Sequence, residues 1–585
     1  MKCNILLKVL FVLSFTFFLG TITAQDTNLE VTQAIQKRFE KLLKKKKVVG
    51  ASVAIVDNGK VVFADGFGFE DREKGIRASA QTMFRIGSIT KNFTALAVMQ
   101  LQEKGLLNIE ESIKVYLPEL TMESGFGDEK ILTIKSIMAH ISGLPSDILN
   151  GMMSSEPPSI EWAIQNLNQF VSSSPDNYAM SYSNVGYGLL GELISRVSGM
   201  TYGDYLTRNI FEPLEMNNSF CGINPKKLAK AYFDKEVFAP ELIRDYAAGS
   251  IASSAQEMAN YLLMQLNDGM YNEKEVISQA SLAMMNENHV GNTHIPATQS
   301  YGFAIDISGL DVTSADEEKT RATLYNHGGD TYAFHANFGY IPELNVGAVI
   351  LTNSENGGKI RSISQLLDFY LEETRGINVS INDNKESESI NSDLLETADV
   401  KGIYSAGPLL MDVQDIEKFT FKQSGQKVVL KRKKGTNKYG ISIRLLGFIP
   451  IKIKAAELEF LKRDNEVFLV QNSLDDGSTM YFAKKEQRQD DYGTWNAKFG
   501  NYEVINACKS NVPFFDFEDA KVELKNNNGL MTLILESMNE TQEYIFNVHN
   551  NKIALTQGIG RHAGTNLVIL DNGNLLFSGF ELKMK

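Results

Sequence analysis

The sequence SITK, residues 88–91, opens a helical pattern that predicts both a fold and a chemistry. Apolar side chains follow it at helical spacing, and Lys104-Gly105 can cap the end of this helix. Because residues three apart lie on one helix face, the Lys91 amine can approach the Ser88 hydroxyl. A serine is a weak nucleophile until its proton is removed, and a partly desolvated lysine can help to remove it. The stretch therefore predicts an activated serine at a helix start, where free N–H groups can stabilise negative charge.

A second motif, YSN at residues 182–184, precedes a helical pattern from Val185 to Val197 and is the only Tyr-x-Asn in the chain. Ser183 or Asn184 can serve as an ordinary N-cap of that helix. Alternatively, the Tyr182 phenol can shuttle protons, shifted towards phenolate by a nearby lysine, while the Asn184 carboxamide holds a substrate amide. The two interpretations are compatible.

A third motif, HGG at residues 327–329, lies between two extended runs, where glycine lets the backbone approach a ligand closely. His-x-Gly also occurs at residues 289–291 and 562–564, but only His327 follows the other two motifs beside predicted strands of the first domain. Backbone N–H groups near Gly329 and Asp330 are expected to form an oxyanion hole together with the Ser88 N–H. His140, by contrast, is expected to be a hydrogen-bonded structural histidine.

The order of these motifs resembles that of the penicillin-recognising serine hydrolases, in particular the class C β-lactamase-like branch. Ser-x-x-Lys comes first at a helix start, Tyr-x-Asn follows in a loop, and His-x-Gly comes last at a strand. The same spacing at Ser424 and Lys427 falls in a strand-turn region and is interpreted as coincidence. Three further runs are similar to that branch, and the resemblance covers residues 25–376: MFRIG at 83–87, HISGLP at 140–145 and AGSIAS at 248–253.

This resemblance implies that Ser88 is the nucleophile of an acyl-enzyme. It makes Lys91 and Tyr182 the general base and acid, with their division of labour left open, and it makes Asn184 the residue that orients the substrate. The substrate site would also include His327, Gly329 and Asp330.

The chain departs from true β-lactamases at the third motif, where those enzymes usually carry Lys-Thr-Gly. A histidine is often neutral near pH 7, so the site lacks a fixed cation for the carboxylate of a β-lactam. Members of the family with His-x-Gly, such as D-aminopeptidases and D-alanyl-D-alanine carboxypeptidases, are mostly peptidases acting on D-residues, and esterases. A peptide or D-amino-acid-containing substrate, possibly derived from the cell wall, is therefore expected in preference to a β-lactam.

Two alternatives stay open at this point. The first is a β-lactamase or esterase of the same family. The second is a catalytically silent protein that recognises penicillins or binds a lipophilic ligand in its C-terminal region. No cofactor or metal is expected, since His289 and His294 lack a third ligand in a defined motif.

Strand patterns at both ends of residues 25–377, with helical patterns between them, predict an α+β domain with an antiparallel sheet flanked by helices. A polar linker is expected over residues 378–397. Residues 398–488 and 489–585 alternate between short strands and turns, and Gly402-Ile403-Tyr404 corresponds to Gly500-Asn501-Tyr502. This pattern predicts two lipocalin-like β-barrels, similar to those appended to some D-aminopeptidases, with one large sandwich as the alternative.

The remaining signals concern compartment and partners. Lys2 and Lys8 precede an apolar run over residues 9–19, and small residues follow up to Ala24, which predicts a signal peptide over residues 1–24. The run is too short to span a membrane, so a periplasmic or extracellular protein without a transmembrane anchor is expected. A net charge of −13 argues against nucleic acid as a partner. An oligomer is possible.

Overall fold

The computed structural model describes residues 29–585, with gaps at 128–131, 173, 225, 235, 296–299, 383–393, 416, 422–426, 446–448, 464–465, 474–478, 511, 513–515, 538–539 and 557–563. The predicted signal peptide lies outside the described residues, as does the centre of the predicted linker. Within the described residues, no helix is long and apolar enough to cross a membrane.

A nine-stranded antiparallel sheet forms the centre of the first domain. Its strand order is β13-β14-β15-β16-β17-β1-β2-β3, and β18 pairs with β14. Strands from both ends of the domain meet where β1 pairs with β17, so the prediction of a sheet completed by the terminal segments is confirmed. The bounds are β1 (Gly50–Asp57), β2 (Lys60–Asp71), β3 (Ile76–Arg77), β13 (Ser300–Tyr301), β14 (Asp306–Thr313), β15 (Lys319–Thr331), β16 (Phe334–Ile341), β17 (Val346–Thr352) and β18 (Asn378–Ile381).

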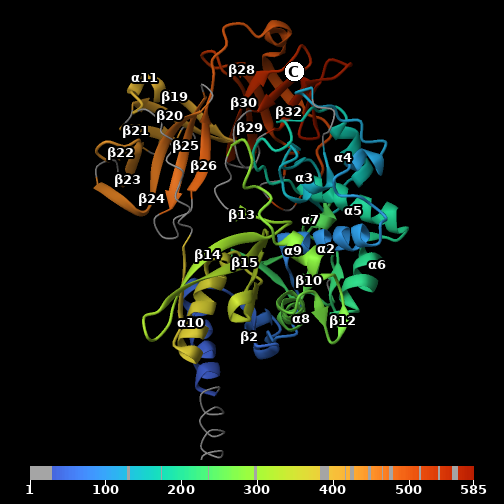
Figure 1. Cartoon of the computed structure of the whole chain (residues 1–585). Helices are drawn as coiled ribbons and strands as arrows, with labels where there is room; N and C mark the ends of the chain where they lie inside the picture. The colour runs from blue at the N-terminus through green and yellow to red at the C-terminus, as the bar shows by residue number, and fades with distance from the viewer. Residues whose placement is uncertain are drawn as a thin grey trace, which may run out of the picture.

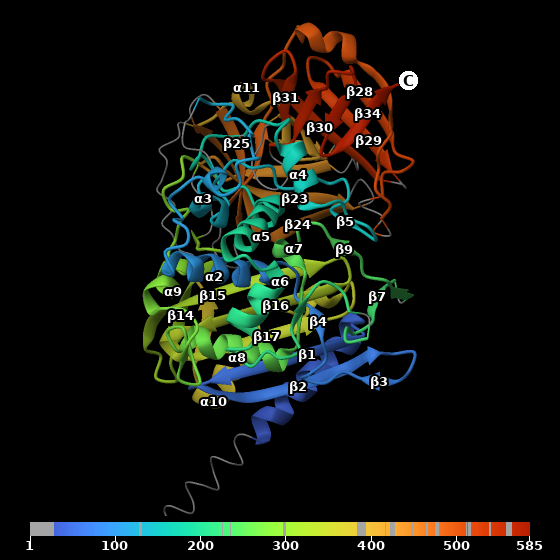
Figure 2. The ribbon, with the colours of Figure 1, turned by 90° about the vertical axis from the view of Figure 1, so that its right-hand side faces the viewer.

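Helices cover both faces of this sheet, so the predicted α+β class is confirmed (Figure 2). The helix over residues 29–46 and α10 (Ile363–Arg375) enclose one core against the sheet. A larger core lies on the other face, beneath α2 (Thr90–Glu103), α5 (Asn184–Ser198) and α8 (Ala255–Leu266). Short elements complete this side: η1 (Gly87–Ile89), α3 (Ile134–Met138), α4 (Ile160–Leu167), α6 (Tyr202–Leu206), α7 (Tyr246–Gly249), α9 (Gln279–Met285), and the small sheets β4 (Phe84–Arg85) with β10 (Ile251–Ser253) and β6 (Phe220–Cys221), and β5 (Met153–Ser154) with β9 (Leu242–Ile243).

The third motif lies inside a continuous strand, whereas the sequence suggested a position between two strands. Strand β15 runs through His327 and pairs with β16 along residues 325–331. The linker also starts later than expected, because residues 378–381 form β18 and Val379 is buried in the core beneath α10.

Two closed eight-stranded antiparallel barrels follow, as predicted (Figure 1). In each, every strand pairs with its sequence neighbour and the last strand pairs with the first. The Gly-x-Tyr repeat opens β19 and β27, the first strand of each barrel. Aromatic side chains fill both barrel cores, including Tyr439 and Phe460 in the first and Trp495 and Tyr544 in the second. The bounds are β19 (Gly402–Ala406), β20 (Leu409–Asp415), β21 (Lys418–Phe421), β22 (Lys427–Arg432), β23 (Lys438–Leu445), β24 (Ile449–Arg463), β25 (Glu466–Ser473) and β26 (Thr479–Lys485), then β27 (Gly500–Val504), β28 (Lys521–Asn526), β29 (Met531–Ser537), β30 (Glu540–Val548), β31 (Ile553–Thr556), β32 (Asn566–Ile569), β33 (Leu575–Phe577) and β34 (Phe580–Met584).

The second barrel is hydrogen-bonded to the first domain at two buried points. Asn566 accepts a hydrogen bond from the Val171 N–H at 3.1 Å and donates one to the Val171 carbonyl at 3.1 Å. At the turn between β33 and β34, the Ser578 hydroxyl accepts from the Leu149 N–H at 2.8 Å, and Asn150 donates to the Gly579 carbonyl at 2.9 Å. These bonds fix the loop over residues 147–150, which leads into the candidate site.

Replacing Asn566 with alanine is expected to lower the free energy of unfolding by about 2–3 kcal/mol, because it leaves two buried backbone groups of Val171 without partners. Urea unfolding followed by tryptophan fluorescence measures the change. The matched control is Asn572→Ala, which removes an exposed hydrogen bond to Glu581 and should change the free energy by less than about 0.5 kcal/mol. Equal effects of the two substitutions would contradict a role for Asn566 in docking.

Candidate active site

The three motifs meet at one cavity of about 450 Å³ between the sheet and the helical side of the first domain. Ser88 comes from η1, Tyr182 and Asn184 from the start of α5, and His327 from β15. The remaining lining residues come from loops around this junction: Met152, Met153, Met180, Ile243, Ala248, Gly249, Tyr301, Asp306, Gly328, Asp330, Thr331 and Tyr332.

Lys91 lies in the first turn of α2 and is fully buried beneath the cavity. Its Nζ is 3.2 Å from the Ser88 Oγ. It also donates hydrogen bonds to the Asn184 Oδ1 at 2.7 Å and to the Ala248 carbonyl at 2.8 Å. Both of these oxygens can only accept hydrogen bonds, so they take two N–H groups of the amine. The Ser88 Oγ is therefore one of at least three polar atoms around this amine.

A carboxylate that no sequence motif indicated holds Asn184 in one orientation. The Asn184 Nδ2 donates to the Asp147 Oδ1 at 2.7 Å, so its Oδ1 must be the atom that faces Lys91. Ser183 is the N-cap of α5, with its Oγ accepting from the Gly186 N–H at 3.0 Å. Both interpretations of the second motif therefore apply to different residues: Ser183 caps the helix, while Asn184 contacts the buried lysine.

The Tyr182 ring packs between two other site residues. Its centroid lies 4.7 Å from the Lys91 Nζ and 4.2 Å from the centroid of the His140 ring. The His140 Nδ1 accepts a hydrogen bond from the Ser183 N–H at 3.1 Å, which confirms the expected structural role of this histidine. Burial lowers the pKa of His140 well below its usual value, so the ring is neutral. His140 thus fixes the loop that presents the tyrosine.

His327 is neutral in this site. Burial, reinforced by the charge of Lys91, lowers its pKa to about 3. Its Nε2 lies 3.2 Å from the Tyr301 hydroxyl and its Nδ1 lies 2.7 Å from the Gly328 carbonyl. A neutral imidazole gives the cavity no fixed positive charge at pH 7, as the departure from Lys-Thr-Gly suggested.

Strand β15 approaches the serine so closely that Gly329 admits no side chain. A Cβ on Gly329 would lie 1.8 Å from the Ile86 carbonyl oxygen and 3.1 Å from the Ser88 nitrogen. A Cβ on Gly87 would lie 2.5 Å from the Asp330 nitrogen. Ser88 and Asp330 both line the cavity, and their backbone N–H groups are the pair that the sequence predicts as an oxyanion hole.

The Asp330 side chain is held by two basic residues. The Arg361 guanidinium donates to its Oδ2 at 2.8 Å, and the His335 ring lies against its Oδ1. A second nitrogen of Arg361 donates to the Gly329 carbonyl at 2.9 Å. The carboxylate therefore anchors the strand, and Arg361 and His335 are positioning residues that no sequence motif indicated.

Asp306, at the start of β14, is a further carboxyl group at the cavity wall. Burial raises its pKa to about 7. None of the lining residues that the structure describes is a lysine or an arginine. Asp306 and Asp330 are the carboxylic acids among these lining residues.

Among the other candidate residues that the structure describes, His289 and His294 do not line this cavity. The residues around Ser424 and His562 lie outside the described residues. His289 stacks on Phe303 with ring centroids 4.0 Å apart, and His294 stacks on Tyr178.

Comparison with known proteins agrees with this geometry. The model of the Beta-lactamase family matches residues 35–368. Protein flp of Staphylococcus aureus (strain N315) is 30% identical over 254 residues, 40% of this chain and 49% of flp, so the chain spans about half the length of that relative. A β-lactamase of Yersinia enterocolitica is 25% identical over 385 residues, 62% of this chain and 97% of that enzyme.

A solved structure shares the fold. The crystal structure of SurE with D-Leu aligns with a TM-score of 0.54 at 18% identity, covering 77% of this chain and 99% of SurE. The family model covers more than half of the chain, and the motifs that define the resemblance meet at one cavity. This chain belongs to the β-lactamase family and carries the fold of its serine hydrolases.

Proposed function

We propose that this protein is an exported serine hydrolase that cleaves an amide or ester bond through an acyl-enzyme on Ser88. The observation that carries the proposal is the buried Lys91 amine, whose Nζ lies 3.2 Å from the Ser88 Oγ while two fixed carbonyl oxygens take its other N–H groups. In its neutral form this amine can accept the serine proton. The signal peptide over residues 1–24 is part of the proposal.

The reaction begins with attack of the Ser88 Oγ on the substrate carbonyl carbon, as its proton passes to the Lys91 Nζ. The carbonyl π electrons move to the oxygen, which the N–H groups of Ser88 and Asp330 stabilise. Collapse of this intermediate breaks the bond to the leaving group, which receives a proton through the Tyr182 phenol. Attack by water on the acyl-enzyme then regenerates Ser88 and releases the acid.

We further propose that the substrate carries a positively charged amine near the scissile bond, as a peptide with a free amino terminus does. Asp306 lines the cavity and can receive an ammonium group, whereas the neutral His327 cannot receive the carboxylate of a β-lactam. Peptides with D-residues are the favoured substrates, in keeping with the His-x-Gly motif. The packed barrel cores argue against a lipophilic ligand inside the barrels.

Ser88→Ala is expected to abolish covalent labelling by a fluorophosphonate probe, because the phosphorylated oxygen is absent. Intact-protein mass spectrometry measures the adduct. The control is Ser424→Ala, which removes the other serine with Ser-x-x-Lys spacing and should leave the adduct unchanged. An unlabelled wild-type protein, or labelling that survives in Ser88→Ala, would contradict the proposal and favour a binding protein.

Lys91→Met and Tyr182→Phe should differ in their dependence on the leaving group. Lys91→Met is expected to lower kcat/KM by about 10²–10⁴ for both p-nitrophenyl esters and peptide amides, since serine activation is common to both. Tyr182→Phe should lower amide cleavage as strongly but ester cleavage by less than about tenfold, because p-nitrophenolate leaves without protonation. If Tyr182→Phe lowered kcat/KM equally for the ester and the amide, the phenol would act on the serine and not on the leaving group.

Asp306→Asn is expected to lower kcat/KM for substrates with a free amine by about tenfold, but not for their N-acetylated forms. With its pKa raised to about 7, the wild-type carboxyl is protonated below that pH and charged above it. Activity on amine substrates should therefore rise with pH through about 7, and this rise should be absent in the variant. Glu318→Gln, at an exposed position before β15, is the control, and an equal loss on acetylated substrates would contradict the assignment.

A further inference from the structure

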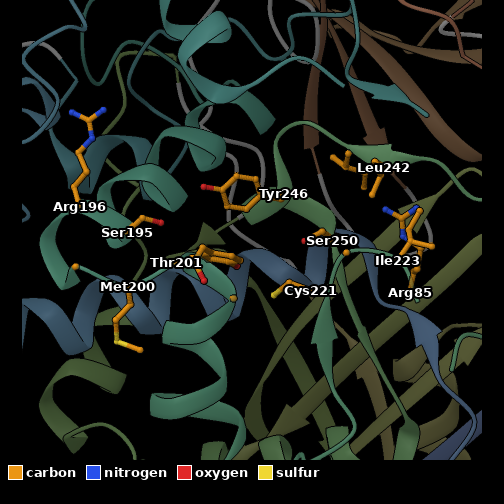
Figure 3. Close-up of a pocket in the computed structure, with 15 residues that line it drawn as sticks. Arg85, Ser195, Arg196, Met200, Thr201, Cys221, Ile223, Leu242, Tyr246 and Ser250 are labelled. Carbon is orange, nitrogen blue, oxygen red and sulfur yellow. The ribbon is translucent and has the colours of Figure 1, made fainter. Parts of the chain in front are cut away.

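A second cavity, of about 730 Å³, lies behind the catalytic one. The segment from Tyr246 to Ser250, which includes α7, separates the two. Its Ala248 and Gly249 line the catalytic cavity, while Tyr246 and Ser250 line the second, and Ile243 borders both. Figure 3 shows Tyr246, Ser250 and Cys221 around the middle of this cavity, with Arg85 at one end and Arg196 at the other.

The Arg85 guanidinium is a buried cation that forms no ion pair with any residue that the structure describes. Its side chain is 2% exposed, and its one hydrogen bond runs from Nη1 to the Glu241 carbonyl at 2.8 Å. Its Nε is buried and has no hydrogen-bond partner, and no carboxylate in the described part of the chain forms an ion pair with it. A buried cation in this condition is costly unless an anion accompanies it.

Other polar groups in the cavity separate into satisfied and unsatisfied ones. Arg196 is already shared between Glu119 and Glu192, so it does not need a ligand. The Ser250 hydroxyl, by contrast, is buried and has no hydrogen-bond partner. Ser250 and Arg85 therefore leave a cation and a hydroxyl donor available in the same cavity.

Most of the remaining wall is apolar, with side chains that include Met200, Ile223, Leu242, Ile243 and Tyr246. In Figure 3 the Arg85 guanidinium lies beside Ile223 and Leu242, so the charge is set among apolar side chains. One uncompensated cation matches one negative charge, and a carboxylate fits the planar fork of a guanidinium. From these residues we propose that the second cavity binds an amphiphilic monocarboxylate, with its carboxylate at Arg85 and its apolar body along the apolar wall.

The test compares three probes of equal chain length, decanoate, decanol and decylamine, by isothermal titration calorimetry on the mature full-length protein. Decanoate is expected to bind at least about tenfold more tightly than decanol, and decylamine should not bind measurably, because only the carboxylate neutralises Arg85. Equal affinity for decanoate and decanol would overturn the proposal.

Gly203→Leu locates the binding. Gly203 lies in α6 and lines this cavity, and a Cβ added there would meet only the Cys221 Cβ, at 3.8 Å, so a larger side chain can fill the space without backbone strain. Decanoate binding should be lost in Gly203→Leu and kept in Gly203→Ala. Binding that persists in Gly203→Leu would place the ligand elsewhere and overturn the proposal.

Arg85→Met tests the charge. It should reduce the affinity for decanoate to that for decanol, and an unchanged affinity would overturn the assignment of the carboxylate to Arg85. If Arg85→Met does not fold, the comparison of Gly203→Leu with Gly203→Ala decides whether decanoate binds in this cavity. Ser88→Ala should bind decanoate like the wild type, so the failure of this proposal and the failure of the proposed hydrolase function are separate outcomes.

Discussion

The site depends on one buried amine. Lys91 has no exposed surface, and an isolated amine at such a position would cost several kcal/mol. The cost is offset because the Asn184 amide and the Ala248 carbonyl accept its hydrogen bonds, and because Asp147 prevents the amide from turning over. Segments from α2, α5, α7 and the loop after α3, which carries Asp147, must therefore converge for the lysine to be tolerated at all. The same arrangement of segments places the Lys91 Nζ beside the Ser88 Oγ.

The barrels contribute to the site although they supply no residue of the three motifs. Val512, from the second barrel, is buried against Met152 and Met153, which line the cavity that contains Ser88. The first barrel contributes Phe468 and Tyr481 to a cluster against which Tyr178 and Ala179 pack, just before Tyr182. Each barrel thus packs against a segment that forms or neighbours the cavity lining.

Local patterns in the sequence were sufficient to predict the elements whose conformation depends on residues close together in the chain. The period of apolar residues after Ser88 indicated a helix, and α2 is that helix. The order of the motifs was enough to assign Ser88, Lys91 and Tyr182 to one site, because each of these residues lies at the end of an element that faces the sheet.

The supporting residues could not be predicted in this way. Asp147 and Arg361 act through partners 37 and 31 positions away, Asp306 reaches the cavity from β14, and none stands in a spacing that suggests its neighbours. The role of Asn184 was only partly foreseen, because its contact with Lys91 depends on tertiary packing. The true extent of β15 was also missed, since glycines at 328 and 329 weaken a strand pattern even where close backbone approach requires them.

The turn between β33 and β34 sets an order of assembly. Leu149 and Asn150 donate hydrogen bonds to Ser578 and Gly579, 429 positions further along the chain. During synthesis the loop that carries Asp147 is therefore made long before the turn that fixes it. A polypeptide that emerges from its amino end can form the central sheet early, yet it gains the support beneath its buried lysine only after the second barrel has been translated and closed.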